Sequence, residues 1–375
     1  MYLLIVRLVT FLSPLFIKQR KFINKSLKNA RKSILALPYY PENFPGSNER
    51  IAAWKEYFES ENIEFNIHWV CNETEYLNSI SNNNPFLRYN FLIKVLFKRI
   101  ILLKSLHTYD AIWIQRSFVP YYPFKKSYLE KKIKKHGNII YDFYDADYTS
   151  NFKLTIQIFQ VAHKITVASD FLERYVRKYN SNVFIIPFSF DFKKYKQKNY
   201  STLNRIVIGW MGSPENFNAV CAIENQLIEI ENKFPFVEFS FICRAQPKIG
   251  LKRLTFHKWN DLNFNYNEII NNFDIGLNPV TEENDINLAK VSFKCLEYMS
   301  LGIAFVTSPI GIPNGIVNHE HAIIVEKIEN WSKSITELIS NIDNIKSLGM
   351  NARKLIEKKY NYSLNYNDLK NTLIN

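Results

Sequence analysis

The sequence predicts an α/β protein with two domains, each built from strands that alternate with helices. Three observations lead to this prediction. At 375 residues the chain is longer than most single domains, and 47% of its residues are hydrophobic, which is enough for two cores. Short apolar runs bounded by turn residues, such as 33–37 and 206–210, are typical of buried strands. Helical patterns follow most of these runs, which favours parallel sheets.

The pattern divides the chain into five parts. An apolar and then basic extension covers 1–32, and the first domain covers 33–192. Residues 193–204 are polar and are predicted to form a linker. The second domain covers 205–346, and further helices are predicted for 347–375.

Charge and cysteine content narrow the class of protein. The net charge is +13, and residues 1–200 contain 31 Lys and Arg against 16 Asp and Glu, so the excess positive charge lies in the first half. This asymmetry indicates that the first half meets an anionic surface or substrate. The four cysteines are far apart in the sequence, with no C-x-x-C pair. A disulfide framework or a zinc site is therefore not expected, and a reducing compartment is favoured.

One helix of the second domain has the chemistry of an anion site. In the segment AKVSFKCLEYMSLGIAFVTS, Lys290, Lys294 and Glu297 are spaced i, i+4 and i+7, which places them on one helix face. Ser292 is positioned to cap the first turn, and Gly302 to end the helix. A helix N-terminus with two lysines favours a phosphate, and a carboxylate one turn deeper can accept hydrogen bonds from ribose hydroxyls. A diphosphate beside a ribose describes a nucleotide-sugar; the alternative is an ordinary solvated helix face.

The second domain opens with a glycine-containing strand and turn. Gly209 and Gly212 lie in RIVIGWMGSPEN, where glycine lets the backbone approach a phosphate closely. The segment does not match G-x-G-x-x-G, so a dinucleotide cofactor is disfavoured. No lysine or arginine lies between Met211 and Ile230, so any cation for a phosphate has to come from elsewhere in the chain.

Polar residues of the first domain follow its predicted strands. Arg116 comes directly after strand 111–115, and the strand that includes 139–141 leads into three aspartates, Asp142, Asp145 and Asp147. A carboxylate at the carboxyl end of a strand could orient or deprotonate a sugar hydroxyl. The alternative is that these aspartates only form turns. The D-x-D spacing of Asp145 and Asp147 is also compatible with a metal site. This is the weaker interpretation of the two aspartates, so no metal is expected.

Two segments have a residue pattern that is typical of segments that bind a membrane surface. Residues 1–17 are mostly apolar but contain Arg7 and Pro14, and basic residues without any acid follow up to 32; this suits an interfacial anchor better than a signal peptide or a spanning helix. Residues 86–104 form a helical pattern in which a basic stripe (Arg88, Lys94, Lys98, Arg99) is bordered by apolar residues (Phe91, Leu92, Val95, Leu102). Nucleic acid is the other use of a basic face, and it is not expected because no nucleic-acid-binding motif is present.

Three segments in the second domain resemble the retaining glycosyltransferases of family 4. They are DIGLNPV, FKCLEYMSLGIAFVTS and SPIGIPNGIV, in the order and spacing of that family. The resemblance implies the GT-B fold, with two Rossmann-like domains facing across a cleft and C-terminal helices that cross back to the first domain. It also implies a metal-independent reaction and a helix of the first domain that docks on membrane.

The resemblance also assigns residues to the donor site. It implies that Gly46, in the first loop, and Gly311 lie near the donor, and that Arg244 and Trp259 lie near the nucleotide base; Trp259 is equally compatible with a core position. One departure concerns the family's paired glutamates, E-x7-E: eight residues before Glu297 the chain has Ala289. The other is that Ala304 replaces the usual proline after the helix-ending glycine.

These observations predict a glycosyltransferase that moves a sugar from a nucleoside-diphosphate donor to a saccharide or lipid-linked acceptor of a surface polysaccharide. The expected location is the cytoplasmic face of the cell membrane, and no cofactor is expected besides the donor. Lys290 and Lys294 would stabilise the leaving diphosphate, Glu297 would bind the donor, and Asp145 would act on the acceptor side. The alternatives are a catalytically inactive binding protein of this fold and a nucleotide-sugar epimerase.

Overall fold

The computed structural model describes residues 4, 7, 31–80, 84–191, 195–200, 205–259 and 266–375. The chain forms two compact units. Unit 1 is Met1–Ser189 together with Tyr362–Asn375, and unit 2 is Phe190–Asn361. The predicted extension 1–32 lies almost entirely outside the described residues, as do residues 192–194 and 201–204 of the predicted linker.

Unit 1 is built on a six-stranded parallel sheet with the order β2-β1-β3-β4-β5-β6. Every residue of the apolar runs SILAL and AIWIQ is buried, which is why these segments form the central strands β1 and β3. Their register pairs Leu35 with Ile112 and Ala36 with Trp113. The strands are β1 (Ser33–Leu37), β2 (Glu64–Ile67), β3 (Ala111–Gln115), β4 (Asn138–Phe143), β5 (Lys164–Val167) and β6 (Val183–Ile185).

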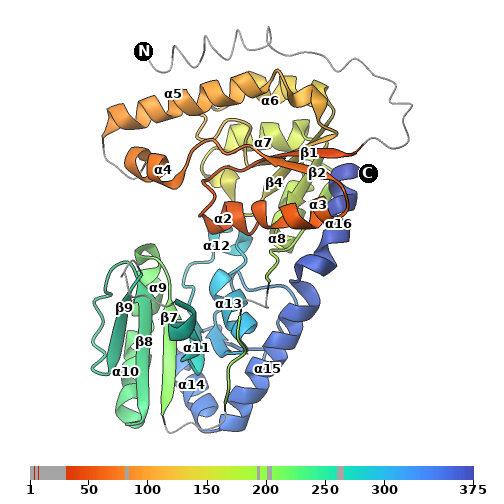
Figure 1. Cartoon of the computed structure of the whole chain (residues 1–375). Helices are drawn as coiled ribbons and strands as arrows, with labels where there is room; N and C mark the ends of the chain where they lie inside the picture. The colour runs from red at the N-terminus through yellow and green to blue at the C-terminus, as the bar shows by residue number, and fades with distance from the viewer. Residues whose placement is uncertain are drawn as a thin grey trace. The chain divides into compact units, whose positions relative to one another are not determined.

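Helices cover both faces of this sheet (Figure 1). On one face, Trp54, Phe58, Tyr362 and Leu369 pack with the sheet residue Trp113 in one buried cluster. The last helix of the chain therefore belongs to the first unit. The helices of unit 1 are α2 (Pro45–Asn48), α3 (Lys55–Ser60), α4 (Glu73–Ile80), α5 (Pro85–Leu102), α6 (Tyr128–Ile133), α7 (Phe152–Val161), α8 (Asp170–Val176) and α16 (Tyr362–Ile374).

Helix α5 buries some of the residues that the sequence pattern placed on its surface. The basic stripe predicted from the sequence includes Arg99, but this side chain is completely buried, and so are the flanking residues Phe91 and Val95. The guanidinium of Arg99 donates to the carbonyl of Pro38 at 2.9 Å. The reason is that this side of the helix packs on unit 1, where the two terminal nitrogens of the guanidinium donate to backbone carbonyls, while its buried Nε has no hydrogen-bond partner among the described residues.

Unit 2 has a second six-stranded parallel sheet, with the order β12-β11-β10-β7-β8-β9. Its strands are β7 (Ile206–Met211), β8 (Val237–Cys243), β9 (Leu254–Lys258), β10 (Ile275–Asn278), β11 (Ala304–Thr307) and β12 (Ile323–Ile324). Its helices are α9 (Phe217–Cys221), α10 (Glu224–Lys233), α11 (Tyr266–Asn271), α12 (Asp285–Ala289), α13 (Phe293–Leu301), α14 (Trp331–Ile339) and α15 (Ile342–Lys359). Both sheets thus have the doubly wound form that places ligands beyond the carboxyl ends of the strands.

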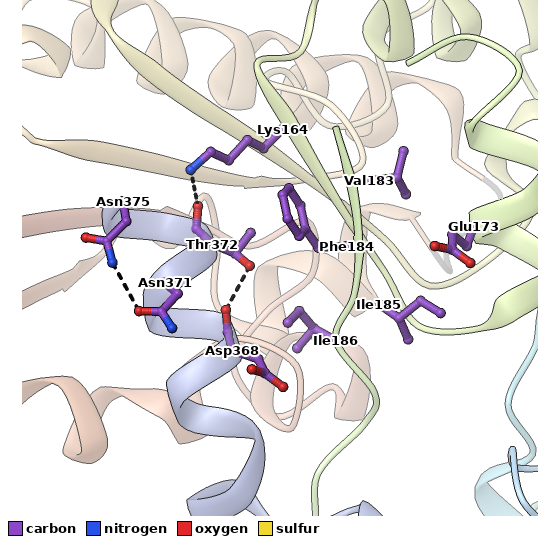
Figure 2. Close-up of a pocket in the computed structure, with 10 residues that line it drawn as sticks. All are labelled: Lys164, Glu173, Val183, Phe184, Ile185, Ile186, Asp368, Asn371, Thr372 and Asn375. Carbon is purple, nitrogen blue, oxygen red and sulfur yellow. Dashed lines mark hydrogen bonds between the residues drawn. The ribbon is translucent and has the colours of Figure 1, made fainter. Parts of the chain in front are cut away.

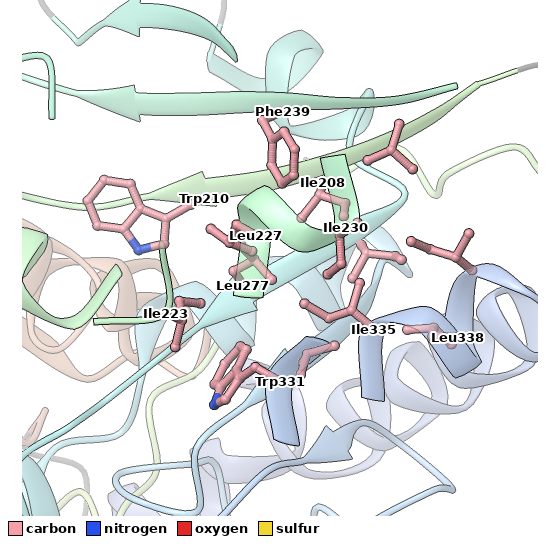
Figure 3. Close-up of a cluster of buried hydrophobic side chains, with 14 of the residues drawn as sticks. Ile208, Trp210, Ile223, Leu227, Ile230, Phe239, Leu277, Trp331, Ile335 and Leu338 are labelled. Carbon is pink, nitrogen blue, oxygen red and sulfur yellow. The ribbon is translucent and has the colours of Figure 1, made fainter. Parts of the chain in front are cut away.

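A large apolar cluster holds helices α10 and α14 on one face of the unit 2 sheet (Figure 3). Trp210 and Phe239 project from the strands, and Leu227, Trp331 and Leu338 meet them from α10 and α14. Each of these side chains is at most 1% exposed. This packing fixes the strands whose carboxyl ends lead to the residues discussed next.

Candidate functional site

The start of helix α13 has the predicted cap. The Ser292 hydroxyl accepts a hydrogen bond from the Cys295 N–H at 3.5 Å and donates to Oδ1 of Asn278, the last residue of β10, at 3.1 Å. The Ser292 N–H donates to the carbonyl of Gly311 at 2.8 Å. At the other end, Gly302 has φ +72° and closes the helix. The cap and the end of this helix are therefore confirmed.

Lys290 is not part of this helix, so its predicted place on one face with Lys294 and Glu297 is wrong. The short helix α12 ends at Ala289, and Lys290 follows it with extended backbone (ψ 150°) and an exposed side chain. The cap at Ser292 then starts a new helix in a different direction. A helical spacing in the sequence does not reveal such a break, because the residues on either side are compatible with one continuous helix.

Lys294 lies in the first turn of α13, against the loop after β7. Its Cε would be 3.3 Å from a Cβ on Gly212, and such a Cβ would also approach the Trp210 ring to 2.7 Å. Glycine is therefore required at position 212 for the loop to pass this close to the lysine. Burial, followed by the nearby charge of Lys290, lowers the pKa of Lys294 below its ordinary value.

Glu297 accepts a hydrogen bond from the Tyr266 hydroxyl at 2.7 Å. The Tyr266 ring in turn lies 4.7 Å from the ring of Trp259, which follows β9 and is 40% exposed. Burial, and then the charge of Glu297, raise the pKa of Tyr266 well above its ordinary value, so its hydroxyl remains a donor at neutral pH. Tyr266 was not predicted, and nothing in its local sequence distinguishes it from other tyrosines.

Gly209 lies within a strand and not in the turn after it, so the structure gives it a role in packing. It lies inside β7 and pairs with Gly276 of β10. A Cβ on Gly209 would come within 2.0 Å of the Phe273 ring, and one on Gly276 within 2.6 Å of the Tyr298 ring. The two glycines make room for these two rings on one face of the sheet, so their role is packing.

Two further predicted donor residues lie in loops of unit 2. Gly311 has φ +65°, and a Cβ there would meet the carbonyl of Asn287 at 2.6 Å, so the loop that fixes Ser292 requires glycine. Arg244 follows β8, is exposed, and its guanidinium lies 3.9 Å from Glu215. Arg244, Gly212 and Trp259 thus follow three neighbouring strands at their carboxyl ends.

In unit 1, Arg116 is surrounded by aromatic rings at the corresponding edge. It follows β3 directly and has φ +60°, a strained value for a residue with a side chain. Its guanidinium carbon lies 5.2, 5.1 and 4.8 Å from the ring centres of Tyr39, Tyr40 and Tyr144. A cation held against three rings has little freedom to move, which suits a group that positions a ligand.

Asp145 and Asp147 are both ion-paired with Arg116, Asp147 at 2.9 Å. One oxygen of Asp147, Oδ2, is buried and has no hydrogen-bond partner among the described residues. Burial raises the pKa of Asp147 to about 7, although the charge of Arg116 opposes this shift. A carboxyl group with this pKa can exchange a proton at neutral pH.

Asp142 is not available to a substrate, contrary to its predicted place on the acceptor side. It lies within β4 and is completely buried. Its carboxylate accepts hydrogen bonds from Arg50 at 3.0 and 2.7 Å and from the Thr166 hydroxyl at 2.6 Å. The predicted strand stops at residue 141, two residues before the true end of β4 at Phe143, and the longer strand draws Asp142 into the core of the sheet.

Gly46 lies in the short helix α2 of unit 1. A Cβ there would come within 2.3 Å of the Tyr144 hydroxyl, and its carbonyl accepts a hydrogen bond from Gln115 at 2.5 Å. Gly46 therefore brings the first loop against the rings around Arg116. Among the described residues, no group of three or more His, Cys, Asp or Glu side chains is placed to hold a metal ion.

The comparisons with known proteins concern the fold and the class of enzyme. The family model described as "Glycosyl transferases group 1" matches residues 206–341. Sucrose-phosphate synthase from Thermosynechococcus elongatus has a similar structure, with a TM-score of 0.65 at 12% identity over 91% of this chain and 98% of that one. HepE from Anabaena, solved with UDP-glucose, has a TM-score of 0.61 at 13% identity over 91% and 98% of the two chains. A glycosyltransferase from Rickettsia africae reaches 0.63 at 12% identity, with the same coverage. A search of curated proteins by sequence found no match.

The chain has the GT-B fold and is a glycosyltransferase. The predicted fold class and enzyme class are therefore confirmed. The group 1 match lies within unit 2, where Lys294, Glu297 and Tyr266 are found.

A groove of about 600 Å³ in this glycosyltransferase lies away from the residues described above (Figure 2). Lys164 and Val183, which line it, are the first residues of β5 and β6. The groove also follows the whole of the edge strand β6 and Ile186 beside the end of α16, whereas Arg116 follows the inner strand β3. Lys164 is also engaged in the structure, since it donates to the carbonyl of Thr372 near the end of α16.

Proposed function

We propose that this enzyme transfers a sugar from a UDP-sugar to a hydroxyl of a saccharide or a saccharide-lipid acceptor, with retention of configuration and without a metal. The observation that carries the proposal is the arrangement at α13, where a capped helix N-terminus, Lys294 and the Glu297–Tyr266 pair lie beyond the carboxyl ends of the strands. HepE, which shares the fold, binds UDP-glucose, and this supports uridine as the base. The product is expected to belong to a cell-surface polysaccharide.

The donor half of the reaction is assigned to α13. As the bond between the sugar C1 and the diphosphate oxygen breaks, negative charge grows on the diphosphate. The Lys294 ammonium lies in the first turn of α13, at the positive end of the helix dipole, and both would stabilise this charge. Lys290, exposed in the loop before the helix, adds positive charge to the same region.

The nucleoside is assigned to Glu297, Tyr266 and Trp259. The Tyr266 hydroxyl holds the Glu297 carboxylate by a hydrogen bond, which fixes it as an acceptor for ribose hydroxyls. Trp259 offers a partly exposed ring for the base. Arg244, after the neighbouring strand, is the cation assigned to this end of the donor.

The acceptor half of the reaction is assigned to the edge of unit 1 around Arg116. The acceptor hydroxyl loses a proton as its oxygen bonds to C1. Asp147, with a pKa raised to about 7, is the group best suited to take part in that proton transfer or to orient the hydroxyl. Arg116 and Asp145 would hold Asp147 and the acceptor in place.

The donor site is tested by nucleotide binding. UDP or a UDP-sugar at 100 times its Kd is expected to stabilise the protein by about 2.7 kcal/mol, measured as a thermal shift. Glu297→Ala should weaken UDP binding by about 1.5–3 kcal/mol in calorimetry, because a charged hydrogen bond is lost. Glu238→Ala is the control, since the Glu238 side chain is 44% exposed in the same unit and, among the described residues, pairs with Arg205 alone. Equal affinities of the two variants for UDP would remove Glu297 from the site.

One observation favours a second candidate, a nucleotide-sugar-binding protein without turnover. The position eight residues before Glu297 is Ala289, which is buried, so the first carboxylate of the resembled pair is absent. Release of UDP from a UDP-sugar separates the candidates: an enzyme releases it in the presence of an acceptor, whereas the binding protein does not. Analysis of the sugar would reveal an epimerase.

We also propose that the solvent face of α5 binds an anionic membrane surface at the cytoplasmic side. Phe86 and Ile101 are 68% and 64% exposed and Phe97 is 44% exposed; Lys94 of the same helix and Lys104, which follows it, are exposed as well. Exposed apolar side chains flanked by lysines favour an interfacial position. Among the described residues, no helix combines the length and apolarity needed to cross a bilayer.

Vesicle binding tests this proposal. Replacing Phe97 and Ile101 by serine is expected to weaken binding to vesicles containing phosphatidylserine by at least about tenfold, since two apolar side chains no longer enter the interface. Phe236→Ser with Ile328→Ser is the control, because these residues of unit 2 are similarly exposed, at 44% and 41%. Equal losses in the two double variants, measured by sedimentation, would contradict a role for α5.

A further inference from the structure

A second hollow lies at the carboxyl edge of the unit 1 sheet. It has a volume of about 430 Å³, and its walls include Glu42, Asn43, Trp69, Asn72, Glu73 and Glu75. The first two residues belong to the loop after β1, and Trp69 follows the end of β2. The hollow is thus at the edge of the sheet that also holds Arg116, and its volume is in the range of roughly 300–1,000 Å³ typical of small-molecule sites. We call it the Trp69 hollow.

The lining of the Trp69 hollow is chemically unusual for a surface depression. Trp69 is half-buried and, among the described residues, stacks on no other ring. Carboxylates and side-chain amides surround it, and Asn43 donates to Glu73 at 2.6 Å, which holds two of them in place. An apolar ring face beside fixed planar acceptors and donors matches a sugar, whose C–H face is apolar and whose hydroxyls both donate and accept.

Other ligands fit the Trp69 hollow less well. Three glutamates disfavour an anion such as a phosphate. The lysine in the wall, Lys98, is engaged with the carbonyl of Val70 at 2.6 Å. Cys71 lies in the wall as well, but burial raises the pKa of its thiol to about 11, so it is a neutral group at physiological pH. The polar walls also exclude a purely apolar ligand.

Aromatic rings connect the Trp69 hollow with Arg116. The Tyr40 hydroxyl accepts a hydrogen bond from Arg116 at 3.2 Å, and the Tyr40 ring stacks on Phe44 at 5.6 Å. The Phe44 ring meets Tyr76 of α4 at 4.9 Å. Glu42 and Asn43, which line the hollow, lie between Tyr40 and Phe44 in the same loop. One loop therefore contributes to both places.

We propose that the Trp69 hollow is a saccharide subsite that holds a sugar unit of the acceptor next to the one at Arg116. Trp69 provides the stacking face, and Glu42, Asn43 and Glu73 bind the hydroxyls. The enzyme then recognises an acceptor of at least two sugar units. This inference rests on the proposed transferase function, because it names the class of acceptor for that site.

The experiment uses the full-length protein labelled with 5-fluorotryptophan and observed by fluorine NMR. The chain has six tryptophans, and the spectrum of Trp69→Phe identifies the Trp69 signal. The probes are methyl glycosides of glucose, galactose, mannose and N-acetylglucosamine, together with maltose, cellobiose and lactose. A disaccharide is expected to shift the Trp69 signal and to leave the signal of Trp259 unchanged.

Variants give the affinity test. Trp69→Ala should weaken the binding of that disaccharide by at least about tenfold, whereas Trp259→Ala, in the other unit, should leave it unchanged. Glu42→Ala is a second variant that tests the hollow without disturbing the fold, because its side chain is exposed. This variant should also weaken the binding of the disaccharide.

The outcomes separate this inference from the proposed function. If no probe shifts the Trp69 signal in a folded sample, or if Trp69→Ala and Glu42→Ala both bind the disaccharide normally, the subsite is refuted even when UDP-sugars are turned over. If the disaccharide shifts the Trp69 signal but no UDP-sugar binds, the subsite stands and the transferase proposal fails. UDP binding by Trp69→Ala is expected to be normal, since the nucleotide is assigned to unit 2.

Discussion

Replacing Lys294 with alanine is expected to lower kcat by about 10²–10³-fold, the effect of removing one preorganised group that stabilises transition-state charge. The Lys294 ammonium lies in the first turn of a capped helix, beside the glycine loop after β7. Its charge adds to the positive end of the helix dipole there. The charge on the diphosphate grows only as the bond to the sugar breaks, so the loss should appear mainly in kcat and less in KM.

Two further lysine variants make the Lys294 result specific. Lys290→Ala should lower kcat by tenfold or less, because Lys290 lies exposed in the preceding loop. Lys333→Ala should have no effect, since this side chain of unit 2 is 79% exposed and only pairs with Glu337. The rate of UDP release at saturating donor is measured for each of the three variants. A loss for Lys333→Ala equal to that for Lys294→Ala would show that the effect is not local.

The pH dependence of kcat provides a second measurement on Lys294. Burial lowers the pKa of this lysine, so its charge is lost at a lower pH than for an ordinary lysine. The rate should therefore fall on the alkaline side as the ammonium loses its proton. Lys294→Arg keeps its charge at high pH and should remove that fall, even if its maximal rate is lower.

Sequence patterns predicted the local features of the fold well. The strands 33–37 and 111–115, the serine cap at 292 and the glycine end at 302 all depend on residues within a few positions of one another. Apolar runs, capping side chains and left-handed glycines act through short-range physics, so the sequence alone contains enough information to place them.

The errors in the site concern burial and direction, which depend on tertiary contacts. Gly209 packs against a ring more than sixty positions away, and Asp142 binds an arginine from another part of unit 1. Arg99 has a helical spacing that suits a surface stripe, but only the packing of α5 shows that it points inward. Tyr266, at the start of α11, meets Glu297 of α13 although the two residues are 31 positions apart in the chain. None of these neighbours is visible from sequence spacing.

Replacing Arg50 with methionine is expected to destabilise unit 1 by about 3–5 kcal/mol, because it leaves the Asp142 carboxylate buried without its counter-charge. The two side chains are 1% and 0% exposed, and three hydrogen bonds join the guanidinium to the carboxylate. Arg50 also donates to the carbonyl of Ile186. Only the Thr166 hydroxyl would remain to stabilise the buried charge.

Removing both charges together should cost much less than removing Arg50 alone. In Arg50→Met with Asp142→Asn, no charge remains buried, and a neutral amide can still bond to Thr166.

Arg205→Met is the matched control, because its 3.0 Å ion pair with Glu238 is exposed at the surface of unit 2 and is expected to contribute less than about 1 kcal/mol. Urea unfolding followed by tryptophan fluorescence measures the variants, with Trp54 and Trp113 buried in unit 1 and Trp210 and Trp331 in unit 2. If Arg50→Met costs no more than Arg205→Met, or if the double variant is as unstable as Arg50→Met alone, the pair does not stabilise unit 1 through its charges. A large loss confined to the transition of unit 1 would show that Asp142 is a structural residue, which leaves Asp145 and Asp147, both paired with Arg116, as the carboxyl groups at this edge for acceptor chemistry.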